Sequence, residues 1–270
     1  MVVQHNLTAM NTNRQLGLTT SAQAKSTEKL SSGYKVNRAG DDAAGLTISE
    51  KMRSQIRGLN KASENAQNGV SLVQTAEGAL NEAHSILQRM NEIATQAAND
   101  TNTTSDRTAI QKEINQLSTE LTRISSTTQF NTMNLLDGKF KNKNLQVGAL
   151  SGQKITISIT SMSATTLGVN ALMVSSFTSA GTAMCAIQKA ISRVSAQRSD
   201  LGAIQNRLEY TINNLNTTSE NTSSAESLIR DTDMATEMVN YSKNQILAQA
   251  GQSMLAQANS ANQGVLSLLQ

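Results

Sequence analysis

The chain has 270 residues and a formal net charge of +3, with aromatic residues at 2%, charged residues at 16% and no proline. So few aromatic and charged residues exclude an ordinary compact domain, in which roughly a quarter of the residues are charged and the core is rich in rings. The positive charge is too thinly spread for a nucleic-acid-binding protein, because even its densest group, residues 139–143, is typical of a solvated loop. The composition favours a mainly α protein, an elongated rod of long helices.

The first predicted helix covers residues 4–32. Its apolar residues are irregularly spaced, so its packing must come from outside the segment. Gly33 is a typical C-terminal cap, because glycine tolerates the left-handed conformation. After a short link, Asp41 and Asp42 supply carboxylates suited to the N-terminus of the next helix. They have no His, Ser or Cys neighbour in the sequence, so we do not predict an acid/base pair.

The longest predicted helix covers Ile48–Ala97, and the rest of the chain is organised around it. Its apolar residues repeat every seven positions in two rows, which is the pattern of coiled-coil-like packing. The larger side chains form the row Met52, Leu59, Ala66, Val73, Leu80, Leu87 and Ala94, and the smaller ones form the row Ala62, Gly69, Ala76, Ala83, Met90 and Ala97. Ile86 and Ile93 widen the stripe, so the helix should pack against more than one partner helix.

Two later segments can supply those partners. Arg107–Thr128 carries an apolar seam after the short polar loop Asn99–Ser105, so it should fold back antiparallel on the long helix. Another helix repeats its apolar residues every seven positions at Ile187, Val194, Leu201, Leu208 and Leu215. We expect the polar stretch Asn216–Ser224 after it to be a hinge or a frayed turn.

The middle of the chain changes its period to two. Apolar residues alternate at 145–147 and again at 155–159, around a turn at 148–152, which predicts a β-hairpin with one buried face. Residues 161–180 are rich in Ser, Thr and Ala, and we expect an irregular connection there.

The last predicted helix is capped by Asp231 and Asp233 and runs to the end of the chain. Its seam consists of Leu247, Met254, Ala261 and Leu268, and Gly251, Ala258 and Val265 follow the first three of these by four residues. The helix has an Ala/Gly face that permits close helix approach. Because neither terminal helix has a core of its own, we expect the two ends to pair, and the pair to be completed by other copies of the chain.

The remaining sequence features argue against several functions. Cys185 is the only cysteine, and its apolar helical setting is typical of a packed small hydrophobe rather than of a nucleophile. No Ser/His/Asp set, metal cluster or phosphate loop is recognisable, so we predict neither an enzyme nor a bound cofactor or metal. The chain also lacks a secretory signal and a membrane-spanning run, which taken alone would predict a soluble cytosolic protein.

Several blocks of the sequence resemble bacterial flagellin. They are Lys29–Asn37, Asp41–Gly45, Gln67–Leu80, Leu87–Ala97 and Thr128–Asn131 in the first half, and Leu201–Leu208 and Ala248–Gln270 in the second. The resemblance implies an inner domain of terminal helices, residues 1–44 with 226–270. It also implies a helical rod domain, residues 45–225, in which residues 140–180 replace the variable outer domains of longer members.

The resemblance also implies a structural function. The chain would polymerise with copies of itself into the flagellar filament that serves motility, after export without a cleaved signal peptide, so the expected location becomes extracellular. The implied partners include an export chaperone at the C-terminal helix and the filament cap and hook-junction proteins. The alternative is a hook–filament junction protein of the same architecture; the block Leu87–Ala97 and the C-terminal tail favour flagellin.

The flagellin-sensing Toll-like receptor of animal hosts is a further implied partner. The resemblance assigns receptor binding to Gln88, Arg89, Met90, Glu92, Ile93 and Ala94, together with Glu113 on the antiparallel helix. Arg89 and Glu92 lie off the seam and Ile93 lies at its edge, so we expect these three side chains to face a partner. The alternative is that these residues serve only the packing of the filament.

Overall fold

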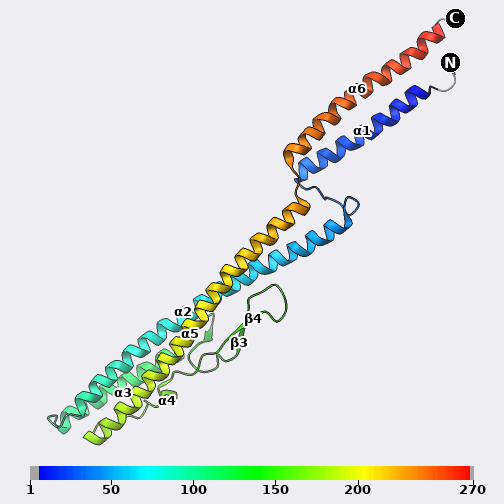
Figure 1. Ribbon diagram of the computed structural model, residues 1–270. Coiled ribbons are helices and arrows are strands. Elements are labelled where there is room, and N and C mark those ends of the chain that lie inside the picture. The colour runs from blue at the N-terminus through cyan, green and yellow to red at the C-terminus, as the bar shows by residue number, and fades with distance from the viewer. Residues whose placement is uncertain (1–5, 268–270) are drawn as a thin grey trace. The chain divides into compact units, whose positions relative to one another are not determined.

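The computed structural model describes the backbone of residues 6–267 and the side chains of residues 6–261. In chain order its elements are α1 (Leu7–Ser32), α2 (Ala43–Ala97), α3 (Thr104–Thr127), β1 (Gln129–Phe130), β2 (Met133–Asn134), β3 (Lys143–Gln146), β4 (Lys154–Ile157), α4 (Ala164–Leu167), α5 (Phe177–Arg230) and α6 (Met234–Ser267). The fold is therefore mainly α with small β-hairpins, as the sequence predicts (Figure 1).

The contacts divide the chain into two compact units. The terminal unit comprises Met1–Ser54 and Asn221–Gln270, and the central unit comprises Gln55–Glu220. These are units of the isolated chain; the division of an assembled subunit at residues 44 and 226 stays a prediction.

The α2 seam forms the core of the central unit. From Leu59 to Ala97 every member of both rows is buried, whereas Met52, in the terminal unit, is partly exposed. The five seam residues of α5 are buried as well. Full burial of one leucine stabilises the fold by about 1.5–3 kcal/mol, so the heptad rows hold these helices together.

Polar side chains reinforce the pairing of α2 with α5 at the Leu59 end of the apolar seam. Ser63 donates a 3.0 Å hydrogen bond to Asn216, and Ser219 donates one of 2.8 Å to Asn60. The predicted hinge at Asn216–Ser224 is therefore wrong, because α5 continues as a helix to Arg230. Asn and Ser break helices by bonding their own backbone, and here Asn216 and Ser219 bond the neighbouring helix instead.

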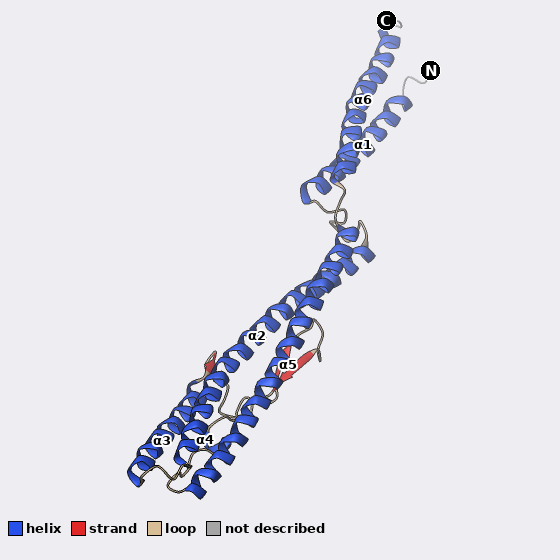
Figure 2. Ribbon diagram, turned by 60° about the vertical axis from the view of Figure 1, so that its left-hand side comes forward, coloured by secondary structure: helices blue, strands red, loops and turns tan. Residues whose placement is uncertain are grey.

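The helix α3 folds back on α2, as predicted (Figure 2). Ile114 and Leu121 are buried in the same cluster as the seams of α2 and α5. The second half of α2 thus has two partner helices, which is why its apolar stripe is wider there.

The predicted β-hairpin is present, with β3 antiparallel to β4 and Leu145 opposite Ile155. A smaller hairpin, β1–β2, was not predicted. Its two-residue turn places Asn131 and Thr132 at φ of 47° and 63°, a left-handed conformation that matches the twist of a hairpin. Asn131 was the only signal for this turn in the sequence.

Two further predictions about the central unit need correction. Residues 161–180 are not wholly irregular, because they contain α4 and the first turn of α5. Ser163 caps α4 by accepting a hydrogen bond from the backbone N–H of Thr166. Cys185 is exposed rather than packed, because the buried face of α5 passes through Ala183 and Ile187 on either side of it.

In the terminal unit, α1 lies antiparallel to α6, so the prediction that the terminal helices pair is confirmed (Figures 1 and 2). Near one end of the pair, Asn6 donates a 3.1 Å hydrogen bond to the carbonyl oxygen of Ala258. Near the other end, Lys29 and Glu237 form an ion pair of 3.8 Å. Gly251 permits the close approach, because a Cβ at this position would lie 3.2 Å from Leu16 Cδ1.

The helix boundaries in the terminal unit follow the predicted caps. Gly33 ends α1 with φ of 76°, and Asp42 accepts a hydrogen bond from the N–H of Gly45 at the start of α2. Asp233 accepts hydrogen bonds from the N–H groups of Ala235 and Thr236 and so caps α6. Asp231 does not cap; it pairs with Tyr34 in an isolated antiparallel bridge.

Across the described part of the chain, none of the helices combines the length and the apolar character that crossing a membrane requires.

Candidate interaction surfaces

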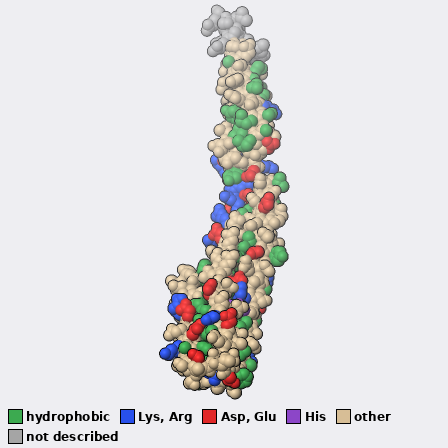
Figure 3. All heavy atoms as spheres, turned by 90° about the vertical axis from the view of Figure 1, so that its left-hand side faces the viewer, with side chains coloured by type: hydrophobic (Ala, Val, Ile, Leu, Met, Phe, Trp, Pro, Cys, Tyr) green, Lys and Arg blue, Asp and Glu red, His purple; other side chains and the backbone are tan. Residues whose placement is uncertain are grey.

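The terminal helix pair exposes most of its large apolar side chains. On α1 these are Leu7, Met10 and Leu18, and on α6 they are Met234, Met238, Val239, Ile246, Leu247 and Met254. Among the described side chains of the two helices, only Ser26, Glu237 and Ala248 are buried. Figure 3 shows apolar side chains along this pair, below the residues drawn in grey. Exposed apolar surface of this extent marks a protein interaction site.

A shallow groove between α1 and α6 lies within this surface. Leu16 and Thr19 line it from α1, and Leu247, Gly251 and Met254 line it from α6. Its volume is about 410 Å³. Asn11, Thr12 and Gln15 also line the groove, so its walls are partly polar, but none of its lining residues is charged. Its aliphatic part suits the docking of side chains from another helix.

A cluster of charges links α2 to α3 in the central unit. The guanidinium of Arg89 donates from Nε to Glu113 Oε1 at 3.1 Å and from Nη1 to Glu92 Oε2 at 3.3 Å. The hydrogen bond to Glu113 is the main cause that raises the pKa of Arg89 above its usual value. About half of the Arg89 side chain (53%) is exposed, as are 68% of Glu92 and 44% of Glu113, so a partner can reach all three.

Three of the seven residues assigned to receptor binding cannot touch a partner. Met90, Ile93 and Ala94 are at most 1% exposed. The expectation that Ile93 faces outward is wrong, because the third helix, α3, covers the edge of the seam and takes Ile93 into the same core cluster as Ile114. Gln88 is exposed, and its Nε2 lies 3.1 Å from Nε2 of His84.

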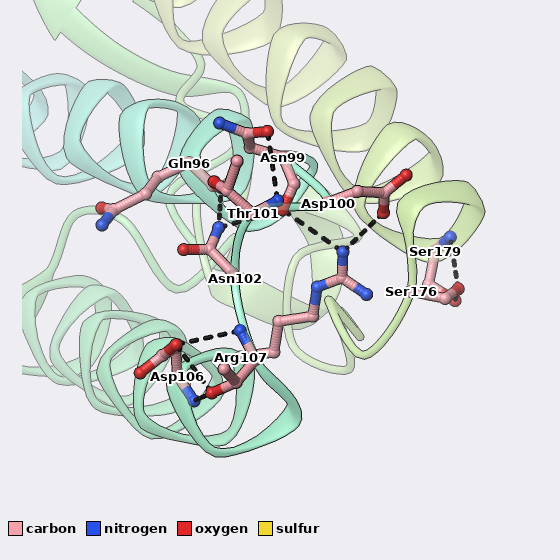
Figure 4. Close-up of polar contacts among 10 residues, drawn as sticks. Gln96, Asn99, Asp100, Thr101, Asn102, Asp106, Arg107, Ser176 and Ser179 are labelled. Carbon is pink, nitrogen blue, oxygen red and sulfur yellow. Dashed lines mark hydrogen bonds and ion pairs between the residues drawn. The ribbon is translucent and has the colours of Figure 1, made fainter.

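Polar contacts hold the turn between α2 and α3 (Figure 4). Thr103 and Asp106 form a capping box, in which the hydroxyl of Thr103 accepts from the N–H of Asp106 and the carboxylate accepts from the N–H of Thr103. Arg107 donates to Asp100 at 2.8 Å and to the carbonyl oxygen of Asn99 at 3.3 Å. These bonds fix where α3 begins, and therefore which of its residues face Arg89.

The described residues include no group of three or more His, Cys, Asp and Glu side chains that could hold a metal ion.

Comparison with known proteins gives two family matches. The family model described as the bacterial flagellin N-terminal helical region matches residues 3–141, and the bacterial flagellin C-terminal helical region matches residues 184–269. Together they cover the terminal helix pair, α2, α3 and nearly all of α5.

Curated relatives match along their whole length. A flagellin of Halalkalibacterium halodurans is 54% identical over 271 residues, and the 31.3 kDa flagellar filament core protein of Treponema maltophilum is 49% identical over 286 residues. Each alignment covers 100% of this chain and 100% of the relative.

Solved structures share the fold. The crystal structure of Bacillus cereus flagellin matches with a TM-score of 0.50 and 30% identity, over 60% of this chain and 94% of that one. A putative flagellar hook-associated protein from Vibrio parahaemolyticus matches with a TM-score of 0.60, over 70% of this chain and 99% of that one. At 15% identity the second match indicates a common fold only.

Proposed function

The chain belongs to the bacterial flagellins, and we propose that it is a subunit of an extracellular flagellar filament whose copies polymerise through the terminal helix pair. The observation that carries this proposal is the exposed apolar surface of α1 and α6, described above. A helix pair that buries so few side chains lacks a core of its own, and further helices can supply one.

The energetics support a polymer. Ile246 is 65% exposed and Met254 is 61% exposed. Fully burying one such side chain is worth about 1.5–3 kcal/mol, and nine large apolar residues of the pair are available in each copy. An interface between two different surfaces of identical subunits can repeat without end and so builds a helical filament.

A hook–filament junction protein is the second candidate, because a hook-associated protein shares the fold. The relatives that are about half identical over their full length are instead named flagellin or filament core protein, which favours the filament. Heat-depolymerised protein returned to filament seeds separates the two functions. Long filaments in electron micrographs support flagellin, and short capped oligomers support the junction protein.

The proposed route to the filament is export, with an export chaperone on the C-terminal helix and addition of subunits beneath the filament cap. Such a chaperone would cover the apolar face of α6, where Val239 is 68% exposed before assembly. The hook-junction proteins would then bind the same helices at the base of the filament.

We also propose that the monomer binds the flagellin-sensing Toll-like receptor through Gln88, Arg89, Glu92 and Glu113. The exposure of these four side chains on one α2–α3 face supports the proposal. Met90, Ile93 and Ala94 would act only by holding α2 in place, since all three are buried. If the same face is covered by neighbouring subunits in the filament, intact filaments bind the receptor poorly.

A further inference from the structure

A shallow hollow lies in the central unit between the β1–β2 hairpin and the segment that leads into β3. Its volume is about 280 Å³. Pockets for drug-sized ligands begin at roughly 300 Å³, so this hollow has room for a small ring. The residues that line it are Thr132, Met133, Asn134, Asp137, Lys139, Phe140 and Lys143. None of them belongs to the α2–α3 face or to the terminal helices, so the hollow is separate from the surfaces described above.

Backbone conformation and hydrogen bonds fix both walls of the hollow. On one side, the hairpin turn holds Thr132 at φ of 63°, a left-handed conformation that is rare for a β-branched residue. On the other side, the carbonyl oxygen of Phe140 accepts a 2.8 Å hydrogen bond from the N–H of Ile159. The N–H of Asn142 donates to Oγ of Ser158 at 2.9 Å. The walls are therefore in place before a ligand binds, as in most small-molecule sites.

The hollow carries two ammonium groups and one carboxylate. Lys139 is 89% exposed, and its Nζ lies 3.7 Å from Oδ2 of Asp137, a loose surface ion pair that a ligand can replace. Lys143 is exposed, and within the described part of the chain its ammonium group has neither an ion pair nor a hydrogen bond. With two cations and one anion, the lining has an excess of one positive charge and suits a ligand that carries one negative charge.

The same hollow offers acceptors for hydroxyl groups. Oδ1 of Asp137 accepts a 2.9 Å hydrogen bond from the backbone N–H of Lys139, which holds the carboxylate in place and leaves Oδ2 available. Thr132 donates its hydroxyl to the carbonyl oxygen of Asn131 at 2.6 Å, so the hydroxyl oxygen can still accept. Met133 is 41% exposed and adds an apolar surface on which the C–H groups of a ring can rest.

We propose that this hollow binds one uronic acid residue of an anionic polysaccharide. The sugar carboxylate contacts the ammonium groups of Lys139 and Lys143, and the sugar hydroxyls donate to Asp137 and Thr132. A sugar with several sulfate groups fits less well, because Asp137 repels the additional charges. The proposal goes beyond filament assembly and does not depend on it, since one copy of the chain supplies every lining residue.

NMR titration of the unseeded full-length monomer with a hyaluronan tetrasaccharide tests the site. Its uronic acid residues carry carboxylates, whereas chitotetraose is a neutral chain of the same length and should bind at least about tenfold more weakly. Lys143→Gln should weaken hyaluronan binding by about tenfold, the loss that corresponds to one charge-assisted hydrogen bond. Lys112→Gln removes an exposed lysine from α3. It is the matched control for net charge and should bind like the wild type.

Two further variants separate a sugar site from a merely basic patch. Asp137→Asn makes the hollow more positive but removes the charged acceptor, so hyaluronan should bind about fivefold more weakly or worse. Thr132→Gly removes a hydroxyl and creates Asn-Gly, the preferred pair for a left-handed hairpin turn. It should weaken binding without lowering the melting temperature measured by circular dichroism.

Three results would each overturn the proposal. The first is that Asp137→Asn binds hyaluronan as tightly as the wild type or more tightly. The second is that Lys112→Gln and Lys143→Gln lose affinity equally. The third is that chitotetraose binds as well as hyaluronan.

Discussion

Arg89 on α2 and Glu113 on α3 are joined by two contacts to one carboxylate oxygen: Arg89 Nε lies 3.1 Å and Arg89 Nη2 lies 3.0 Å from Glu113 Oε1. The pair holds the guanidinium extended across the α2–α3 face, with its remaining N–H groups toward Glu92 and solvent. Arginine is one of the residue types enriched at the hot spots of protein interfaces, and this one is half-exposed and held in place before a partner binds.

Receptor binding should therefore depend on Arg89. We expect Arg89→Ala to weaken binding of the monomer to the receptor by about thirtyfold or more, as loss of an interface hot spot does. The melting temperature should change little, because exposed ion pairs add little stability. Surface plasmon resonance with the receptor ectodomain measures the first effect and circular dichroism the second. Lys61→Ala, which removes an exposed lysine paired with Glu64 elsewhere on α2, is the control. Wild-type affinity in Arg89→Ala would show that the site has been assigned wrongly.

The heptad seam predicts a large effect at Leu80. Its side chain has no exposed surface, so Leu80→Asp places an unpaired carboxylate in the core. The substitution should lower the free energy of unfolding by on the order of 5 kcal/mol. In a chain of this size each kcal/mol shifts the melting temperature by about 2–4 °C, so the melting temperature should fall by about 10 °C or more. Asn81→Asp adds the same charge at an exposed neighbour and should melt like the wild type. Equal melting of the two variants would mean that the seam is wrongly placed.

Two glycines of α2 should respond in opposite ways to alanine. At Gly78 a Cβ would meet no atom within 4 Å, so Gly78→Ala should stabilise the helix by about 0.5–1 kcal/mol. At Gly58 a Cβ would lie 2.9 Å from the Cβ of Ala149 in the β3–β4 turn, and the turn must move. Gly58→Ala should therefore gain nothing or lose stability. Denaturant unfolding measures the stability of both variants. An equal gain in stability in both would show that the β3–β4 turn does not contact α2 at Gly58.

Acid should weaken the start of α6. The pKa of Asp233 is lowered from the ordinary value of 3.8, mainly by the hydrogen bond from the Thr236 hydroxyl. A carboxyl group whose pKa is lower in the folded state than in the unfolded state stabilises the fold at pH values above its unfolded pKa. This stabilisation is lost as the pH falls below 3.8 and then through the pKa of the folded state. Asp106 and Asp41 are shifted in the same direction.

Asp233→Asn keeps a good N-cap but cannot titrate. Its helical signal should fall less than that of the wild type when circular dichroism is recorded from about pH 5 down to pH 2. Asp200→Asn removes a carboxylate within α5 and serves as the control for charge alone. A wild-type acid response in Asp233→Asn would contradict a role of this cap in acid stability.

The regular features of the chain could be predicted because they are local in sequence. The rows through Leu80 and Leu201, and the caps Gly33 and Asp233, follow from spacing and residue type alone. Errors arose where a distant segment decides the outcome. Ile93 was expected to face outward, but a third helix buries it.

Other features depend on contacts between residues far apart in the chain. Asn216 is helical because it bonds Ser63, and the contact of Arg230 with Tyr34 brings together two segments that no sequence pattern relates. The irregular apolar spacing of α1 correctly indicated a helix that cannot bury its own apolar residues, of which Leu7 is 70% exposed.

Seeded polymerisation of the double variant Ile246→Gln/Met254→Gln tests the central claim most directly. Both side chains are exposed in the monomer, and glutamine keeps the helix propensity, so the circular dichroism spectrum and the melting of the central unit should match the wild type. With filament seeds, the wild type should give long filaments in electron micrographs, and the variant should give none. Filaments of normal length from the variant would contradict assembly through the apolar surface of the terminal helix pair.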